Sequence, residues 1–187
     1  MFIALGLAVA VAAGAPAAPA QTPPAGQTFA FAALLLRGYH NLQGNLLAAA
    51  EKMPDADYSF RPTPEIRPFG QLVAHVALAQ FGSCAALKGE PDPKKEVKED
   101  AARSKAEQIE LLKASTAYCD PVLDALNDQA LTETFKNGQN TVAKGLVLTG
   151  TNSHGNEMYG TMAVYLRLKG IVPPTTEKEM AAKAKGK

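Results

Sequence analysis

Histidines are the side chains of this sequence best suited to acid–base or metal chemistry, and there are three of them: His40, His75 and His154. A neutral imidazole is a common metal ligand, and its unperturbed pKa lies near physiological pH. His75 lies in residues 72–78, which are otherwise apolar, and His154 lies on a stripe of helical spacing in residues 147–168. His40 has no partner pattern around it, so we interpret it as a structural or surface residue.

The distances of His75 and His154 from the expected helix ends predict that they meet. His75 is 13 residues before Lys88, and His154 is 13 residues after Thr141. In antiparallel helices those ends should be level, and both imidazoles then lie about 20 Å from them. Two inward histidines at one height can begin a metal site. The alternative is a pair of core histidines whose nitrogens are satisfied by side chains or water.

The third ligand of such a site is missing from the expected position. A catalytic zinc site usually has three protein ligands, but position 158, one turn after His154, carries methionine. A thioether is a poor zinc ligand beside imidazole and carboxylate. Glu157 can bring a carboxylate toward the same face, and Asn156 is a weaker candidate. We therefore predict a divalent-metal site of His75, His154 and Glu157 in which metal binding is weak or absent.

No motif in the sequence fixes a reaction. A nucleophile elbow, a phosphate-binding loop and a dinucleotide fingerprint are all missing. Ser153 and His154 are adjacent, but adjacent residues on a helix face apart and form no dyad. The formal net charge of +1 gives no strong field to attract nucleic acid or an anionic membrane. We therefore expect an unknown small molecule, and no nucleic acid, as the partner.

The first residues are typical of an export signal. An uncharged apolar run from Phe2 to Ala13 leads into small residues that end in Ala18-Pro19-Ala20. The run is shorter than the roughly 20 residues of a membrane span. We predict a signal peptide over residues 1–20, a linker over residues 21–27, and a periplasmic or secreted product without a stable membrane span. An uncleaved N-terminal anchor is the alternative.

The rest of the chain predicts an all-α four-helix bundle over residues 28–174. The helical patterns cover residues 28–53, 68–88, a segment that starts at the capping box of Ser104 and Glu107, and residues 141–169. Strand-like alternation is not evident. The connection over residues 90–103 is long enough to run the length of a bundle, which makes the second and third helices parallel and gives an up-down-down-up order. We expect residues 175–187 to form a disordered tail.

Two further features of the expected helices bear on stability. Cys84 and Cys119 are 16 and 15 residues beyond the starts of the two parallel helices, so they lie at nearly the same height, and an exported protein meets an oxidising compartment. We predict a disulfide between them; two buried thiols are the alternative. The last helix contains glycines at positions 145, 150, 155 and 160. They either leave room beside a site or are small residues without a specific role.

Two blocks of sequence resemble the DinB-like superfamily. The first is residues 53–76, which run from Met-Pro-Asp-Ala-Asp-Tyr to the segment around His75. The second is residues 153–160, Ser-His-Gly-Asn-Glu-Met-Tyr-Gly, followed by residues 164–174. The resemblance covers about residues 29–174. It implies an up-down-down-up bundle, often a homodimer, with a divalent metal, typically zinc or nickel.

In that resemblance the metal is held by one histidine of the second helix and two of the fourth. His75 matches the first ligand and His154 the second, while Met158 stands where the third histidine is expected. Some relatives are metal-dependent thiol S-transferases. Two functions follow for this chain: a pocket-bearing binding protein with a degenerate metal site, or a metal-dependent enzyme, thiol S-transferase-like or a hydrolase, that uses His75 and His154.

Overall fold

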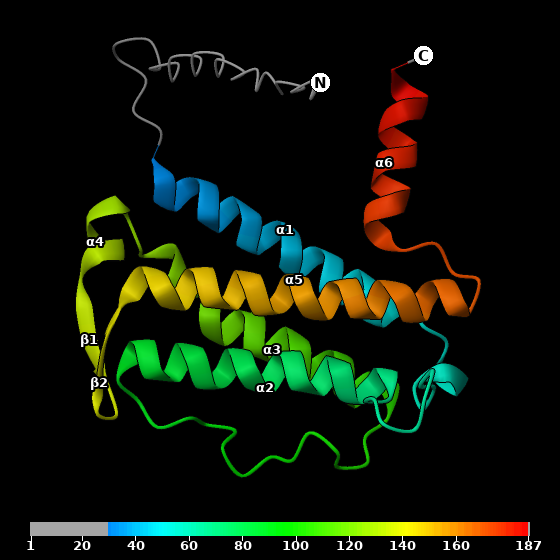
Figure 1. The fold of residues 1–187 in the computed structure, drawn as a ribbon, viewed down its shortest axis with the longest axis horizontal. Coiled ribbons are helices and arrows are strands. Elements are labelled where there is room, and N and C mark those ends of the chain that lie inside the picture. The colour runs from blue at the N-terminus through cyan, green and yellow to red at the C-terminus, as the bar shows by residue number, and fades with distance from the viewer. Residues whose placement is uncertain (1–29, 187) are drawn as a thin grey trace, which may run out of the picture.

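The computed structural model describes residues 30–186 and consists mainly of helices (Figure 1). In chain order the elements are α1 (Phe31–Lys52), the 3-10 turn η1 (Asp55–Asp57), α2 (Phe69–Lys88), α3 (Lys105–Asp124), α4 (Asp128–Thr132), β1 (Thr134–Asn137), β2 (Asn140–Ala143), α5 (Lys144–Leu168) and α6 (Pro174–Lys185). The predicted signal peptide and the whole of the predicted linker fall within residues 1–29, which lie outside the described residues.

The four long helices form the predicted bundle. Around the bundle, α1 packs on α5, α5 on α2, α2 on α3, and α3 on α1. In Figure 1, α1 and α5 run from left to right, whereas α2 and α3 run in the opposite direction. The long connection between α2 and α3 returns along the length of the bundle, which confirms the up-down-down-up order. The core between the helices contains Phe69 and Tyr165, both essentially inaccessible to solvent.

The ends of the helices follow the local signals in the sequence. Gly89 closes α2 with a φ of 71°, a left-handed conformation that favours glycine. The Ser104 side chain accepts a hydrogen bond from the Glu107 N–H, and the Glu107 carboxylate accepts one from the Ser104 N–H, so the predicted capping box is present. The prolines between α1 and α2 leave only η1 in that connection. These signals set the lengths of the helices that carry the histidines.

The predicted disulfide is present in the bundle. Cys84 of α2 and Cys119 of α3 are bonded, with their Cα atoms 5.4 Å apart, and both are buried. Parallel α2 and α3 bring the two residues to the same height, as their equal distances from the helix starts require. Among the described residues, α2 alone has the length and hydropathy of a membrane span, but 61% of that window is buried inside the bundle. Such burial is expected of a helix at the centre of a fold.

The prediction that no strands occur is wrong for residues 134–143. Strands β1 and β2 form an antiparallel hairpin in which Asn137 pairs with Asn140, and the two-residue turn places Gly138 at φ 59°. Glycine at the first position of such a turn is favoured because it adopts positive φ without strain. The hairpin takes up Thr141, so α5 begins at Lys144 rather than at the predicted position. Each strand has only four residues, too few to show a clear alternation.

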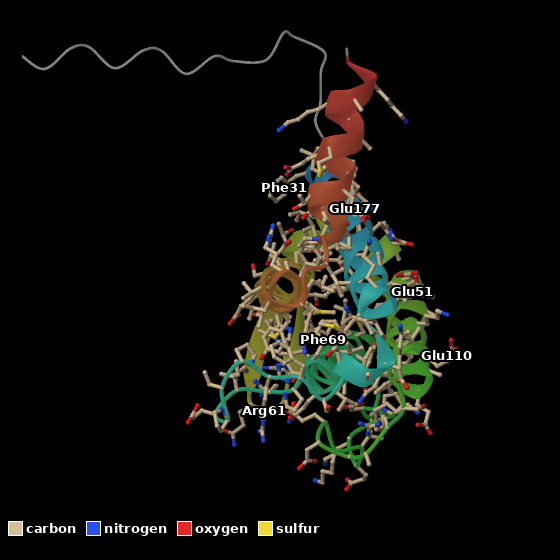
Figure 2. All side chains as sticks on the ribbon, turned by 90° about the vertical axis from the view of Figure 1, so that its right-hand side faces the viewer. Phe31, Glu51, Arg61, Phe69, Glu110 and Glu177 are labelled. Carbon is tan, nitrogen blue, oxygen red and sulfur yellow. A yellow bond between two sulfur atoms is a disulfide. The ribbon has the colours of Figure 1, made fainter. Side chains whose placement is uncertain are left out.

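The prediction of a disordered tail is also wrong for the residues that the structure describes there. Pro174 occupies the first turn of α6, a position where its missing N–H is not needed. The Tyr159 hydroxyl accepts a hydrogen bond from the Thr175 N–H, and Lys178 donates one to Asn45. In Figures 1 and 2, α6 nevertheless rises away from the bundle, and most of its residues are exposed. The polar composition that suggested disorder is therefore that of a solvated helix.

Candidate metal and ligand site

The structure brings His75 of α2 and His154 of α5 together, as their spacing predicts. Their Nε2 atoms are 3.0 Å apart, and the ring centroids are 5.0 Å apart with the planes inclined at 64°. Both side chains are partly buried between the two helices. His75 is 13 residues before the end of α2, and His154 is 10 residues after the start of α5, so the two residues lie at similar distances from these neighbouring helix ends.

Glu99, in the connection between α2 and α3, completes this arrangement and was missed by the sequence analysis. Its Oε2 is 2.7 Å from His75 Nδ1, and its Oε1 accepts hydrogen bonds from Arg67 Nε and Gln71 Nε2, both at 3.0 Å. The sequence shows only that a polar connection passes beside α2. Which of its several carboxylates turns inward depends on the path of the backbone.

The carboxylate of Glu99 sets the hydrogen-bonding state of the pair. A carboxylate at Nδ1 favours the tautomer in which His75 donates from Nδ1, so that its Nε2 presents a lone pair. His154 then donates from Nε2 to His75. Burial, and secondly the neighbouring His75, lower the pKa of His154, while Glu157 opposes this shift. Burial alone would raise the pKa of Glu99, but hydrogen bonds from His75 and Arg67 outweigh it and the pKa is lowered.

Met158 lies one turn beyond His154 on α5 and is buried, with 9% of its surface exposed. It lines a cavity of about 550 Å³ that also includes Leu72, one turn before His75, and Glu99. The remaining lining residues are Arg61, Pro64, Glu65, Ile66, Arg67, Gln71, Thr161 and Tyr165. Figure 2 shows Phe69 inside the bundle and Arg61 on the connection outside it, so that this connection forms one wall of the cavity.

The structure does not bring Glu157 to the pair. Its side chain is exposed, and its carboxylate forms no hydrogen bond or ion pair with His75 or His154 among the described residues. Asn156 is exposed as well and donates to the Asn152 carbonyl. In residues 30–186, no group of three or more histidine, cysteine or acidic side chains is arranged to hold a metal ion. The prediction that Glu157 replaces the third histidine therefore lacks geometric support.

His40 lies elsewhere, in agreement with its interpretation as a structural residue. Its Nε2 is 2.8 Å from Asp124 Oδ1, an exposed contact between α1 and α3, and its ring packs edge-on against Tyr39. Tyr39 in turn donates a hydrogen bond to Asp120. These contacts join α1 to α3. His40 is therefore not part of the site that contains His75 and His154.

Comparison with known families agrees with this geometry. The DinB superfamily model matches residues 39–158, more than half of the chain. The chain belongs to the DinB superfamily. A comparison with curated protein sequences finds no match.

Solved structures show the same DinB fold at low sequence identity. A DinB-like protein from Bacillus cereus has a TM-score of 0.62 and 16% identity, covering 75% of this chain and 93% of that protein. A DinB-like protein from Bacillus subtilis has a TM-score of 0.59 and 19% identity, covering 73% and 92%. A mutant of mycothiol-dependent maleylpyruvate isomerase has a TM-score of 0.57 and 16% identity, covering 68% and 59%. At these identities the likeness establishes the fold alone.

The residues present fit only part of the divalent-metal site that the DinB resemblance implies. Two ligands at about 2.0–2.1 Å in tetrahedral geometry are roughly 3.3 Å apart, so the observed 3.0 Å would need only a small outward movement. Glu99 on His75 Nδ1 is the outer partner that metal-bound histidines commonly have. In the ligand set that the resemblance implies, however, Met158 stands where the third nitrogen is expected. The zinc or nickel set is therefore incomplete.

Proposed function

We propose that this DinB protein is an exported binding protein that takes a small molecule into the cavity beside His75 and His154, with a divalent-metal site that has degenerated. One observation carries the proposal: the two imidazoles hydrogen-bond to each other. Met158, which stands where the DinB resemblance implies a third ligand, supports it because this side chain is buried. A pair satisfied in this way does not need a metal ion to compensate its buried nitrogens.

The cavity supports the small-molecule part of the proposal. Its volume of about 550 Å³ lies within the range of small-molecule sites, roughly 300–1,000 Å³. Leu72, Met158 and Tyr165 give it an apolar floor. Arg67 is paired with Glu99, so Arg61 is the lining guanidinium without an ion pair among the described residues. An apolar body with an anionic end is the ligand class that this lining favours.

A metal-dependent enzyme is the second candidate, and the Glu99 contact is the observation that favours it. A carboxylate that holds the far nitrogen of a histidine raises the basicity of that ligand and fixes its orientation. If His75 and His154 acquired a metal with water as a third ligand, the metal would supply an activated water or thiolate. Thiol S-transfer and hydrolysis are the reaction classes that the DinB resemblance implies.

Metal analysis separates the two candidates. We expect purified protein to contain no stoichiometric zinc or nickel, and calorimetric titration with zinc to give weak binding that His75→Ala abolishes. Stoichiometric zinc or nickel in the wild-type protein, together with tight zinc binding that depends on His75, would instead favour the enzyme candidate.

The ligand cavity can be tested with the fluorescent probe 1-anilinonaphthalene-8-sulfonate, which has an apolar body and one anionic group. Thr161 of α5 lines the cavity, whereas Thr149 of the same helix does not; each hydroxyl donates to the carbonyl four residues earlier. We expect Thr161→Trp to fill the cavity and reduce probe binding, and Thr149→Trp to leave it unchanged. Equal binding by both folded variants would contradict the proposed cavity.

Export is supported by the apolar run and the small residues that precede Gln21. We expect N-terminal sequencing of the native protein to begin at Gln21. Recovery of the native protein from the cytoplasm with Met1 intact would refute this part of the proposal.

A further inference from the structure

The potential metal ligands at the imidazole pair are two imidazole nitrogens and a thioether sulfur, a combination that suits a soft metal ion. His75 and His154 bring their Nε2 atoms to 3.0 Å from each other, and Met158 lies one turn from His154 on the same face of α5. Met158 shares its cavity with Leu72, which is one turn before His75 on α2, and with Glu99, which contacts His75 Nδ1. Its thioether is thus on the side of α5 that faces the pair. Zinc takes thiolate, imidazole and carboxylate ligands, whereas a thioether favours Cu(I).

Few other soft donors in the chain could compete for such an ion. The sequence has two cysteines, and both are in the disulfide. Of the methionines that the structure describes, Met53 and Met162 are completely buried in the core, and Met180 is 60% exposed on α6. Of the described methionines, only Met158 is buried, lines the cavity and lies one helical turn from a histidine.

The charge of the site also favours a monovalent ion. Imidazole and thioether bind metal ions as neutral ligands, and the Glu99 carboxylate is shared with Arg67. The side chains of His75 and Glu99 are only 24% and 31% exposed. Because the cost of removing an ion from water rises steeply with its charge, an uncompensated divalent ion is penalised more than a monovalent one.

We propose that His75, His154 and Met158 form a Cu(I) site that discriminates against zinc and nickel. The inference rests on the proposed function in one respect, since the ion occupies the degenerate metal site beside the ligand cavity. When the ion binds, the proton of His154 moves from Nε2 to Nδ1, so that both His75 and His154 bind through Nε2. Met158 binds through its thioether, and Glu99 orients His75 from Nδ1.

The test is an anaerobic competition for Cu(I) between the protein and a chromophoric bicinchoninate chelator. Ascorbate keeps the copper reduced, and a thiol assay verifies that the disulfide remains intact. We expect one Cu(I) per chain. Loss of an outer partner of a metal ligand costs about 10–100-fold in affinity, so Met158→Leu, which removes a direct ligand, should cost at least as much. Met162→Leu removes a thioether of the same helix and should leave the affinity unchanged.

Two further measurements make the result decisive. With selenomethionine in place of methionine, X-ray absorption at the copper edge should show a selenium neighbour in wild type and Met162→Leu but not in Met158→Leu. Met158→His should raise zinc affinity and reduce the preference for Cu(I). Circular dichroism verifies that each variant is folded.

Equal Cu(I) affinities for folded Met158→Leu and Met162→Leu, or tighter binding of zinc than of Cu(I) by wild type, would overturn the copper site. Neither result affects the probe experiment with Thr161→Trp. Failure of the copper site is thus distinguishable from failure of the ligand cavity.

Discussion

Substitution of Gly155 in α5 tests how closely the helix that carries His154 packs on α1. A Cβ atom built on Gly155 would lie 2.6 Å from Leu42 Cδ2 and 3.4 Å from Leu42 Cγ. Leu42 is only 3% exposed and packs in the main core, so its side chain has little space to move. At Gly150 and Gly160, by contrast, a Cβ would have no such neighbouring atom within 4 Å. The four glycines of this helix are therefore not equivalent.

The magnitudes follow from two opposing effects. Replacing glycine by alanine inside a helix gains about 0.8–1.0 kcal/mol from propensity at all of these positions. Overpacking a core typically costs about 1–3 kcal/mol, and this cost applies only at Gly155. We therefore expect Gly155→Ala to lower the free energy of unfolding by up to about 2 kcal/mol. Gly150→Ala and Gly160→Ala should each raise it by about 1 kcal/mol.

Denaturant unfolding followed by circular dichroism measures these differences directly. Thermal unfolding gives a second reading, since 1 kcal/mol corresponds to about 2–4 °C for a chain of this size. Because the propensity gain is common to all three variants, the difference between Gly155→Ala and the two controls isolates the contact with Leu42. If Gly155→Ala stabilises the protein as much as Gly150→Ala does, the close approach of α5 to α1 is wrong.

Three other predictions concern the disulfide, the carboxylate on His75 and the cap of α3. Replacing Cys84 and Cys119 together by serine should lower the free energy of unfolding by about 3–4 kcal/mol in the chain-entropy model for a separation of 35 residues, and chemical denaturation of the oxidised wild type provides the comparison. Glu99→Ala should shift His75 from the Nδ1–H toward the Nε2–H tautomer in 15N NMR spectra, and an unchanged tautomer would refute the role of this carboxylate. Hydrogen bonds, first from the backbone and then from the side chain of the N-cap residue, lower the pKa of Glu107. Its contribution to stability is thus present above the unfolded pKa of about 4.3 and is lost as the pH falls through the lower folded pKa. The difference in melting temperature between wild type and Glu107→Gln should shrink over that range, and a constant difference down to pH 2 would contradict it.

Local signals in the sequence were sufficient for the bundle. Apolar periodicity, the prolines after α1, Gly89 and the capping box at Ser104 each act within a few residues, so they locate helix ends without knowledge of the fold. The length of the 90–103 connection then fixed the relative directions of α2 and α3. From those directions the disulfide and the meeting of His75 with His154 followed, because the rise per residue is constant along a helix.

Local signals were not sufficient for the short elements. The β1–β2 hairpin has four residues in each strand, which is too short for alternation to stand out from a helical pattern. Its two turn residues, Gly138-Gln139, carry glycine at the first position, a hairpin signal that is present in the sequence and could have been recognised. The polar composition of α6 does not distinguish a solvated helix from a disordered tail, and the contacts of Thr175 and Lys178 decide it.

The sequence by itself therefore determined the family, the bundle and the meeting of His75 with His154. Only the tertiary structure decided that Glu99 holds His75, that Glu157 faces solvent, and that Gly155 rather than Gly160 packs against α1. These contacts join residues distant in the chain, and several carboxylates and glycines were equally suited to them. The choice depends on differences of a few ångströms in the backbone path, which helical periodicity and composition do not specify.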